Sequence, residues 1–474
     1  MVVGDMEMHT DLLVIGGGPG GYGAAFRAAD LGLDVILVDS QWGLGGFCLH
    51  AGCIPAKALL HAAELIHDAE RAKIMGIGFG PPRIDLAALR AWQQQRIDTM
   101  AEALMTLGQK RGILVLRSKA RFTGSSAVRL TGAEISAVRF KHAVIATGSR
   151  ARGLPGVDFT SGGRIMDAGA ALALTDIPQT ILVANTGYIG LELASIYAAL
   201  GSEVTLLEQA DRLLPTVDAD LVVPLQESLT ARFAEIVLGA KIEEVVEDAG
   251  GVDVRFTRSG TTEQRRADRV LLANGRIANS DDLGLDHTGV TLNSRGFIET
   301  DETRRTRDPK IFAVGDVAGG PLLAHKAIRE GRIAAETIAG KISSFDVRAL
   351  PVVVYTNPQL AWCGLTEREA RQANIPHAVK KFPWQLSDRA QTLDETGGLT
   401  KLVIDPDSGR ILGAGIVGRH AEGLIAETAL AIEMGALAED LALTLHPYPT
   451  LSETESEAAE IFLGNPMHAL PESQ

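Results

Sequence analysis

A chain of 474 residues is long enough for about three domains. Its formal net charge of −14 argues against nucleic acid or an anionic membrane as a partner, because both select basic surfaces. Three cysteines are too few for a disulfide-stapled secreted protein, and neither the acidic N-terminus (residues 1–10) nor any later stretch resembles a signal peptide or a membrane span, so we expect a cytoplasmic protein.

The first predicted elements form one βαβ unit around a glycine-rich turn. An apolar strand (residues 12–15) leads into the turn, an alanine-rich helix (22–30) follows it, and a second strand (35–38) ends on Asp39. The spacing is that of a dinucleotide-binding motif: the first glycine permits the turn, the second lets a pyrophosphate approach the backbone, and the third lets the helix pack on the strand. Phosphates would meet the positive end of the helix, and Asp39 would bind ribose hydroxyls. The three glycines are Gly16, Gly18 and Gly21.

A cysteine pair, Cys48 and Cys53, follows in a glycine-rich segment. In a regular helix their Cα atoms would lie beyond the ~7 Å limit for a disulfide, so the start of this helix must be distorted, and Gly52 makes that possible. A bridge that closes so short a loop restricts the unfolded chain little, which favours redox exchange over a stabilising role. Lys57, four residues after Cys53, would face the same side of the helix and favour a thiolate. Cys363 has no partner in the sequence, and we expect it to fill the core.

A second copy of the βαβ unit begins about 170 residues further on, which implies a second domain and a second nucleotide. Gly187 and Gly190 keep the spacing of the turn, but Asn185 stands in the place of its first glycine. Asparagine is among the residues that best tolerate a positive φ, so we expect the turn to survive with some strain or an altered approach of the phosphate. Glu208 ends the following strand, and a carboxylate there favours a free 2′-hydroxyl, which predicts NAD rather than NADP. The flanking elements are predicted at residues 181–183, 191–200 and 204–207.

The last part of the chain, about 120 residues after Pro351, forms a separate predicted α/β block. Strands are expected near residues 402–404 and 411–417, and a helix from about Ala421. No low-complexity tract or long linker interrupts the chain, so we expect the domains to pack tightly.

Several further motifs follow one another in a fixed order. Together with the two turns, they make the sequence resemble the class I pyridine nucleotide-disulfide oxidoreductases, and most closely the dihydrolipoamide dehydrogenases, nearly end to end. The matching segments are Gly45-Gly46-Phe47-Cys48, Cys53-Ile54-Pro55-Ala56-Lys57, Ala146-Thr147-Gly148, Gly187-Tyr188-Ile189-Gly190-Leu191-Glu192, Gly275-Arg276, Ile311-Phe312-Ala313-Val314-Gly315-Asp316, Leu323-Ala324-His325-Lys326-Ala327 and Pro449-Thr450-Leu451-Ser452-Glu453.

The resemblance implies an α/β fold with two Rossmann-like dinucleotide-binding domains and a C-terminal α+β dimerisation domain. FAD and NAD would be the cofactors, and a homodimer would share its active sites between subunits. A dithiol, either dihydrolipoamide or the lipoyl group of a carrier protein, would reduce the cysteine pair, and the electrons would pass through FAD to NAD. The predicted domains are FAD-binding (residues 1–150 and 280–350), NAD-binding (151–279) and dimerisation (351–474).

The resemblance also assigns roles to individual residues. Cys48 looks like the interchange thiol that meets the disulfide substrate, and Cys53 like the thiol that faces the flavin. Lys57 would pair with Glu192 beside the flavin ring, and Asp316 would bind the ribityl chain of FAD. Gly315 would allow a close approach there, and the other cofactor-binding positions implied by the motifs are Thr147, Gly148, Gly275, Arg276 and Ala324.

The C-terminal motif departs from the family pattern at the acid–base. Dihydrolipoamide dehydrogenases read His-x-His-Pro-Thr-x-x-Glu, in which the second histidine is the acid–base and the glutamate orients it. Here Tyr448 replaces that histidine, between His446 and Glu453, and a phenol with an ordinary pKa near ~10 is a poor general base at neutral pH. Three interpretations are open: His446 acts as the base; Tyr448 donates a hydrogen bond in an enzyme that is slow or uses an acidic thiol; or both residues only pack at the interface and the substrate needs no base.

Two relatives of the family also carry tyrosine at this position. Mercuric reductases use a C-terminal cysteine pair as well, which residues 464–474 lack, and soluble transhydrogenases usually lack the complete cysteine pair that this chain has. The alternative functions are an NADH-driven reductase of another small disulfide or of a metal ion, and a flavoprotein-like subunit kept for assembly without catalysis. The intact Cys48, Cys53, Lys57 and Glu192 argue against the second, because scaffolding requires none of them.

Overall fold

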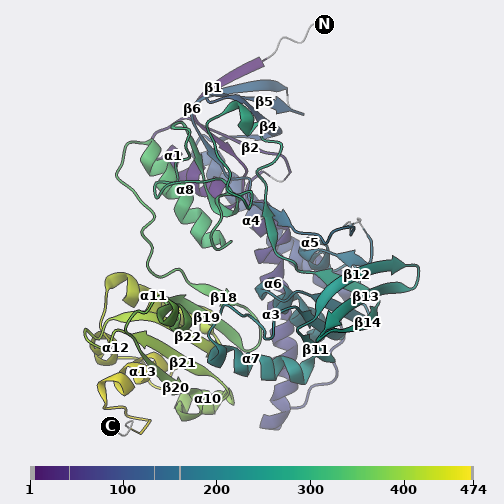
Figure 1. Cartoon of the computed structure of the whole chain (residues 1–474), viewed down its shortest axis with the longest axis vertical. Helices are drawn as coiled ribbons and strands as arrows, with labels where there is room; N and C mark the ends of the chain where they lie inside the picture. Colours follow the sequence, from purple (N-terminus) through teal and green to yellow (C-terminus); the bar gives the residue numbers. More distant parts are fainter. Residues whose placement is uncertain (1–5, 42, 133, 158, 160–161, 471–474) are drawn as a thin grey trace. The chain divides into compact units, whose positions relative to one another are not determined.

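The computed structural model describes residues 6–41, 43–132, 134–157, 159 and 162–470 (Figure 1). The start of the chain up to Asp5, expected to carry no signal peptide, lies outside these residues. The chain divides into two compact units. The first contains Met1–Ala58, Asp85–Arg152 and Gly275–Asp346, and the second contains Leu59–Ile84, Gly153–Asn274 and Val347–Gln474.

A seven-stranded sheet forms the centre of the described part of the first unit. Its members are Met6–Ile15 (β1), Val35–Asp39 (β2), Leu114–Arg117 (β3), Lys119–Gly124 (β4), Ala127–Thr131 (β5), Ile135–Ile145 (β6) and Ile311–Ala313 (β17). The order is β3-β2-β1-β6-β5-β4, and β17 also pairs with β6. The strands β3, β2, β1, β6 and β17 are parallel, whereas β5 and β4 continue the sheet in antiparallel fashion.

Both faces of this sheet are covered, so the end of its central strand is apolar at every position. Leu12 and Val14 of β1 pack with α1 (Pro19–Asp30) and α8 (Ala324–Ile338), and the residues between and after them, Leu13 and Ile15, enter the core on the opposite face. All four side chains are at most 4% exposed. The rigid carboxyl end of β1 therefore fixes the glycine turn that leads into α1.

The second unit contains a parallel sheet with the order β11-β10-β9-β15-β8. Its strands are Ile165–Met166 (β8), Thr180–Ala184 (β9), Glu203–Glu208 (β10), Glu235–Leu238 (β11) and Arg269–Leu272 (β15). An antiparallel sheet shares its core and consists of Lys241–Asp248 (β12), Gly251–Arg258 (β13) and Thr261–Ala267 (β14). The helices of this part are Ala168–Leu172 (α5), Tyr188–Ala199 (α6) and Ala219–Arg232 (α7).

The C-terminal part of the second unit is an antiparallel sheet with the order β18-β19-β22-β21-β20. Its strands are Val352–Val354 (β18), Gln359–Gly364 (β19), Ala378–Pro383 (β20), Leu399–Ile404 (β21) and Ile411–Gly418 (β22). Its helices are Glu367–Gln372 (α9), Asp388–Leu393 (α10), Ala421–Met434 (α11), Ala438–Leu443 (α12) and Glu453–Leu463 (α13). Cys363 is 2% exposed in the core of this part, which confirms its expected role as core filling.

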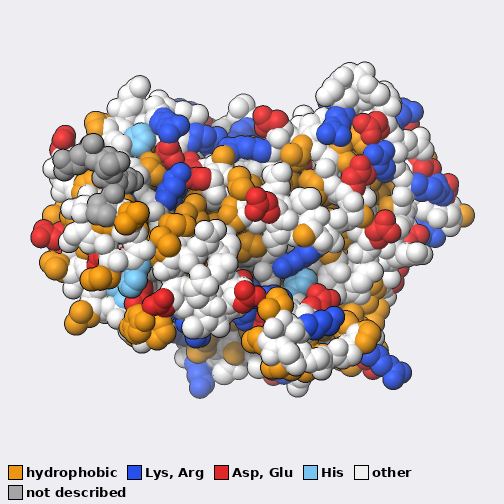
Figure 2. Space-filling view, turned by 90° about the horizontal axis from the view of Figure 1, so that it is seen from below, with side chains coloured by type: hydrophobic (Ala, Val, Ile, Leu, Met, Phe, Trp, Pro, Cys, Tyr) orange, Lys and Arg blue, Asp and Glu red, His pale blue; other side chains and the backbone are white. Residues whose placement is uncertain are grey.

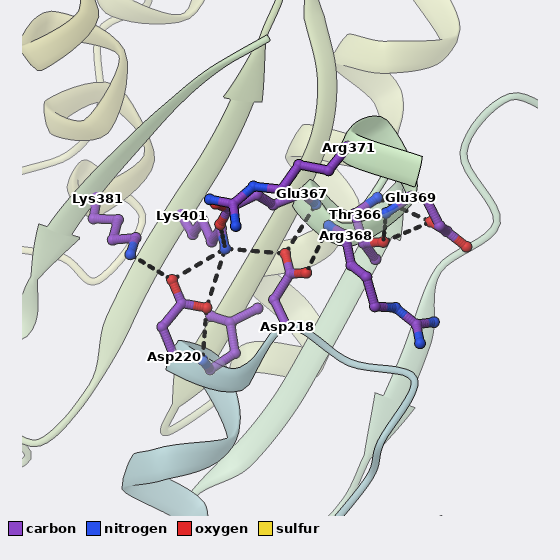
Figure 3. A network of polar contacts seen from close by, with 10 residues as sticks. Asp218, Asp220, Thr366, Glu367, Arg368, Glu369, Arg371, Lys381 and Lys401 are labelled. Carbon is purple, nitrogen blue, oxygen red and sulfur yellow. Dashed lines mark hydrogen bonds and ion pairs between the residues drawn. The ribbon is translucent and has the colours of Figure 1, made fainter. Parts of the chain in front are cut away.

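A buried ion-pair network links α7 to the C-terminal sheet (Figure 3). The ammonium group of Lys401, a residue only 1% exposed, contacts the carboxylates of Asp218 (3.0 Å), Asp220 (3.0 Å) and Glu367 (2.6 Å). Lys381 approaches Asp220 from the more exposed side at 2.6 Å. The network fixes the start of α7 against β21 and α9.

The predicted α/β class is confirmed: two sheets with parallel nucleotide-binding topology accompany an antiparallel C-terminal sheet with its own helices. The bounds of the three predicted domains stay a prediction. Among the residues that the structure describes, no helix combines the length and apolarity needed to cross a membrane.

Candidate active site

The first glycine turn connects β1 to α1 in a conformation that only small residues permit. Gly16 has a φ of +103°, and a Cβ there would lie 2.3 Å from the carbonyl oxygen of Ala146. A Cβ on Gly21 would lie 1.8 Å from the carbonyl oxygen of Gly16, so this glycine allows the helix to pack on the turn. Gly18 is the extended N-cap residue of α1, and no side chain caps the helix. The positive end of α1 is thus open to an anion.

Asp39 lies at the end of β2 beside this turn. One carboxylate oxygen accepts a hydrogen bond from the backbone N–H of Gly17 at 2.9 Å. The other accepts from the N–H groups of Gln41 (2.9 Å) and Gly43 (3.2 Å). These amides orient the carboxylate at the place where the motif predicts a ribose.

The second turn, between β9 and α6, has the same backbone form. Asn185 has a φ of +61°, which confirms that asparagine tolerates a positive φ at the position of Gly16. Gly187 is the N-cap of α6 with φ −67° and ψ −179°, close to the −67° and −177° of Gly18. Gly190 packs on the turn, where a Cβ would lie 3.2 Å from the carbonyl oxygen of Asn185. The second turn therefore also presents an uncapped helix end.

Glu208 occupies the same place at the end of β10 that Asp39 occupies at the end of β2. The residue is 8% exposed. One carboxylate oxygen accepts from both the N–H (2.8 Å) and the hydroxyl (2.6 Å) of Thr186, and the other accepts from the N–H of Ala210 (2.8 Å). Three donors thus orient the carboxylate.

The cysteine pair lies where two helices meet. The first helix, Gly46–Ala51 (α2), ends at Gly52, whose φ of −135° and ψ of −110° are not helical, and the second, Cys53–Arg71 (α3), begins at once. A Cβ on Gly52 would lie 3.0 Å from the ring and the carbonyl oxygen of Phe47. The predicted distortion at Gly52 is confirmed, and it brings the sulfur atoms of Cys48 and Cys53 to 2.6 Å.

The surroundings of Cys48 act on its thiol in opposite directions. The hydrogen bond with Cys53 and burial raise the pKa of Cys48 far above its ordinary value, whereas the positive charge of Lys57 lowers it. The effect of Lys57 has the direction that the sequence predicts.

Other predicted cofactor positions meet near this pair in the first unit. The hydroxyl of Ser149 donates to a carboxylate oxygen of Asp316 at 2.5 Å and accepts from the guanidinium of Arg276 at 2.7 Å. The same guanidinium lies 4.4 Å from the ring centre of Phe47, the neighbour of Cys48. Around this chain of contacts, Thr147 donates to the carbonyl of Asn279, Gly148, Gly275 and Gly315 have φ values of +71°, +86° and +75°, and Ala324 begins α8.

Glu192, the predicted partner of Lys57, makes a hydrogen bond within the second unit. Glu192 is 3% exposed and accepts a hydrogen bond from the N–H of Tyr355 at 3.0 Å. Lys57 belongs to the first unit, so the pairing of Lys57 with Glu192 stays a proposal.

The predicted acid–base segment is rich in contacts. Tyr448 is 69% exposed, and its hydroxyl donates to a carboxylate oxygen of Asp388 at 2.8 Å, which raises the pKa of the phenol. Glu453 accepts from the N–H of Thr450 at 2.6 Å and so caps the turn before α13. Neither contact makes Tyr448 a better base.

His446 is held on both sides of its ring. Nδ1 lies 3.0 Å from the carbonyl oxygen of Thr444, and Nε2 lies 2.8 Å from a carboxylate oxygen of Glu427. Both ring nitrogens therefore face oxygen atoms of the same unit. Its side chain is 7% exposed.

Comparison with known families decides the classification. The model described as pyridine nucleotide-disulphide oxidoreductase matches residues 10–331, and the model of the dimerisation domain of that family matches residues 350–459.

The chain belongs to the pyridine nucleotide-disulphide oxidoreductases.

Curated relatives in this oxidoreductase family match the chain over nearly its whole length. The dihydrolipoyl dehydrogenase of Geobacillus stearothermophilus is 41% identical over 99% of this chain and 100% of its own length, and that of Vibrio cholerae is 40% identical over 97% and 96%. The crystal structure of LpdA from Mycobacterium tuberculosis is 26% identical, with a TM-score of 0.87 over 95% of this chain and 99% of LpdA. RclA from Escherichia coli, a HOCl-induced flavoprotein disulfide reductase, is 25% identical with a TM-score of 0.85 over 96% and 99%.

Membership makes the protein a flavoprotein oxidoreductase that uses FAD and NAD. The described residues fit both cofactors. Gly18 and Gly187 leave open space at two uncapped helix ends, where a pyrophosphate needs room and donors. Asp39 and Glu208 stand at the ends of the adjoining strands, and Asp316 supplies a further acceptor near the cysteine pair.

The match to the dimerisation domain of the family makes the protein a homodimer. The surface of the C-terminal part is consistent with this match. Figure 2 shows one face, on which charged side chains are interspersed with exposed hydrophobic ones. Exposed apolar side chains that need a cover are frequent near the C-terminus: Leu430, Met434, Leu443, Leu445, Leu463, Met467 and Leu470.

The sequence predictions missed several residues that the structure brings to these sites. Asn274 contacts Asn185, Thr186 contacts Glu208, and Glu427 contacts His446. His468 contacts Glu457, and its pKa is raised by that hydrogen bond and by the nearby charges of Asp388 and Glu453. No spacing rule signals these pairs, although the histidine in the tail after α13 is visible in the sequence.

Proposed function

We propose that the protein is a dihydrolipoyl dehydrogenase, which transfers electrons from dihydrolipoamide or a protein-bound dihydrolipoyl group to NAD. The observation that carries this proposal is the Cys48–Cys53 pair, with its sulfur atoms 2.6 Å apart in the same compact unit as the first nucleotide turn. Relatives with this name match nearly the whole chain. Glu208 at the end of β10 supports NAD over NADP, because a carboxylate at this position favours a free 2′-hydroxyl over a 2′-phosphate.

The reaction of the cysteine pair is a thiol–disulfide exchange. A substrate thiolate attacks the Sγ of Cys48 in the oxidised pair, a mixed disulfide forms, and the Sγ of Cys53 leaves with the electrons of the broken bond. The second substrate thiol displaces Cys48, so the substrate leaves as a disulfide and the protein holds two thiol groups. FAD, when bound, supplies the two-electron link between this pair and NAD. The substrate thiols release protons, so the site needs an acid–base group.

The contacts of the second unit support His468 as that group. Tyr448 directs its proton to Asp388, and His446 faces acceptors on both sides. His468 is held by Glu457 through Nδ1, its side chain is 42% exposed, and this arrangement leaves Nε2 for proton exchange. A histidine oriented by a buried carboxylate has the properties of a general base near neutral pH.

The proposal extends to the assembly. As the family resemblance implies, the acid–base group of one subunit serves the cysteine pair of the other. Because the base and the NAD turn both depart from the family pattern, at Tyr448 and Asn185, the proposed dithiol is carried by a specialised lipoyl-bearing protein. A cytoplasmic location agrees with the low cysteine content and with a reactive pair that needs a reducing compartment.

The proposal is tested by mixing the purified flavoprotein anaerobically with dihydrolipoamide and NAD. We expect NADH to form over many turnovers. Absence of NADH, together with turnover of NADH by another small disulfide, would replace the proposal with the reductase alternative.

The preference for a carrier is tested separately. A lipoylated carrier domain should give a higher kcat/KM than free dihydrolipoamide. An equal or lower value would remove the carrier from the proposal and leave the dithiol chemistry in place.

A further inference from the structure

The turn after β9 carries two side chains that have no counterpart in the first turn. Asn185 and Thr186 stand where the first turn has Gly16 and Gly17. A Cβ on Gly17 would lie 1.6 Å from the carbonyl oxygen of Gly43, so the first turn has no room for a side chain at that position. The second turn has space for side chains at both positions, and polar side chains occupy it.

Asn185 reaches to one side of β9, toward β15. Its side-chain N–H donates a hydrogen bond to the side-chain oxygen of Asn274, which follows the end of β15. The remaining N–H group of Asn274 is buried and has no partner among the described residues. A buried N–H without a partner is unfavourable for folding, so this N–H does not explain why an amide stands at position 274. The favourable contact of the Asn274 amide is the hydrogen bond that its oxygen accepts from Asn185.

Thr186 reaches to the other side of β9, toward β10. The residue is 1% exposed, and its hydroxyl donates to Glu208 at 2.6 Å, in addition to its own N–H at 2.8 Å. In the first turn, Asp39 receives only the backbone N–H from the equivalent residue Gly17. Glu208 is thus held more firmly than Asp39 from the turn side.

We propose that these two pairs form a side-chain clamp that positions the NAD turn: Asn185–Asn274 and Thr186–Glu208. Because β9 lies between β10 and β15 in the sheet, the clamp ties the turn to both neighbouring strands at the edge where nucleotides bind. A glycine would adopt the positive φ of this turn without help. Asparagine does so less readily, and the hydrogen bond to Asn274 holds Asn185 at its positive φ. Thr186 fixes the carboxylate of Glu208 toward the adenosine ribose and so sets the preference for NAD over NADP. The clamp rests on the proposed function only in taking NAD as the nucleotide.

The first arm is tested with a double-mutant cycle on the flavin-loaded dimer, measured as the Kd for NAD and for ADP-ribose by calorimetry. The variants are N274V, N185G and the double variant. N274V should weaken binding about 3- to 10-fold, the range expected for one hydrogen bond. N185G restores the glycine, which adopts a positive φ without a partner, so adding N274V to N185G should change nothing.

Equal weakening by N274V in both backgrounds, or no weakening in either, would overturn this arm. Flavin content and dimer mass of each variant confirm that it folds. Since no dithiol is present, the cycle is independent of the cysteine chemistry. If the two substitutions are not coupled but the enzyme still oxidises the dithiol, only the clamp is refuted. If they are coupled but the dithiol is not oxidised, only the proposed function is refuted.

The second arm is tested with T186V and the matched control T186S, which keeps the hydroxyl. The Kd values for NAD and NADP are measured on the same samples. T186V should lower the preference for NAD several-fold, whereas T186S should retain it. An unchanged ratio in T186V would show that Thr186 does not set the specificity.

Discussion

At the level of single residues, the three cysteines fall into two kinds that differ in their surroundings. Cys48 and Cys53 contact each other beside Lys57, whereas Cys363 is 2% exposed and burial raises its pKa to about 12. A buried neutral thiol is chemically inert. The proposed reaction therefore needs two of the three cysteines.

The variants C48S and C53S are each expected to lose at least about 10³-fold in NAD reduction by dihydrolipoamide, because serine cannot form the mixed disulfide or the bridge. C363A is the matched control and should keep most of the turnover. Flavin absorbance verifies that all three proteins fold. Substantial turnover in C48S would refute the proposed exchange.

The proposed base is also a residue-level feature with a defined pH dependence. The hydrogen bond to Glu457 raises the pKa of His468, and Asp388 and Glu453 act in the same direction; Glu460, also on α13, adds a further nearby charge. A base must be neutral to accept a proton, so kcat/KM for dihydrolipoamide should fall as the pH falls through this raised pKa.

In E457Q the main cause of the shift is removed, so this acid limb should move to lower pH. H468Q should lose the limb and about 10²-fold or more in rate. The exposed His377 offers a control, because H377Q should leave the profile unchanged. Retention of the wild-type limb in H468Q would exclude His468 and return attention to Tyr448 and His446.

At the level of elements, the sequence predicts those parts whose cause is local. The turn glycines, the carboxylates at the strand ends and the break at Gly52 follow from spacing and backbone sterics, and each is found. The partners of Asn185 and His446 do not follow, because they lie 89 and 19 residues away and meet only after the strands and helices have packed. The absence of the family histidine is visible in the sequence, but the proposed replacement, His468, is recognised only by its contact with Glu457 on α13.

The contribution of the Lys401 network to holding α7 against the C-terminal sheet can be measured by substitution. K401M removes the buried ammonium group that three carboxylates share, and we expect a loss of about 3–5 kcal/mol in the free energy of unfolding. K381M removes the half-exposed partner from the same network and should cost about 1 kcal/mol or less. Urea unfolding of both variants compares them. Equal losses would show that burial does not distinguish the two lysines.

For the whole molecule, the exposed apolar side chains of the C-terminal part predict where the dimer forms. Leu430 and Met434 are 63% and 77% exposed and lie on one face of α11. The double variant L430E/M434E should shift the dimer toward monomer and reduce turnover, if subunits share active sites. V246E on β12, another half-exposed apolar position, serves as the control and should remain a dimer. Light scattering after size exclusion reads out the mass.

The central claim is that electrons travel from a dithiol to NAD through Cys48 and Cys53. Its most direct test mixes the oxidised flavoprotein anaerobically with a stoichiometric amount of dihydrolipoamide, divides the sample, alkylates one half and adds NAD to the other. The account predicts that both cysteines become alkylated together in the first half and that one NADH forms per reduced subunit in the second. NADH formation while Cys48 and Cys53 stay protected from alkylation would contradict it.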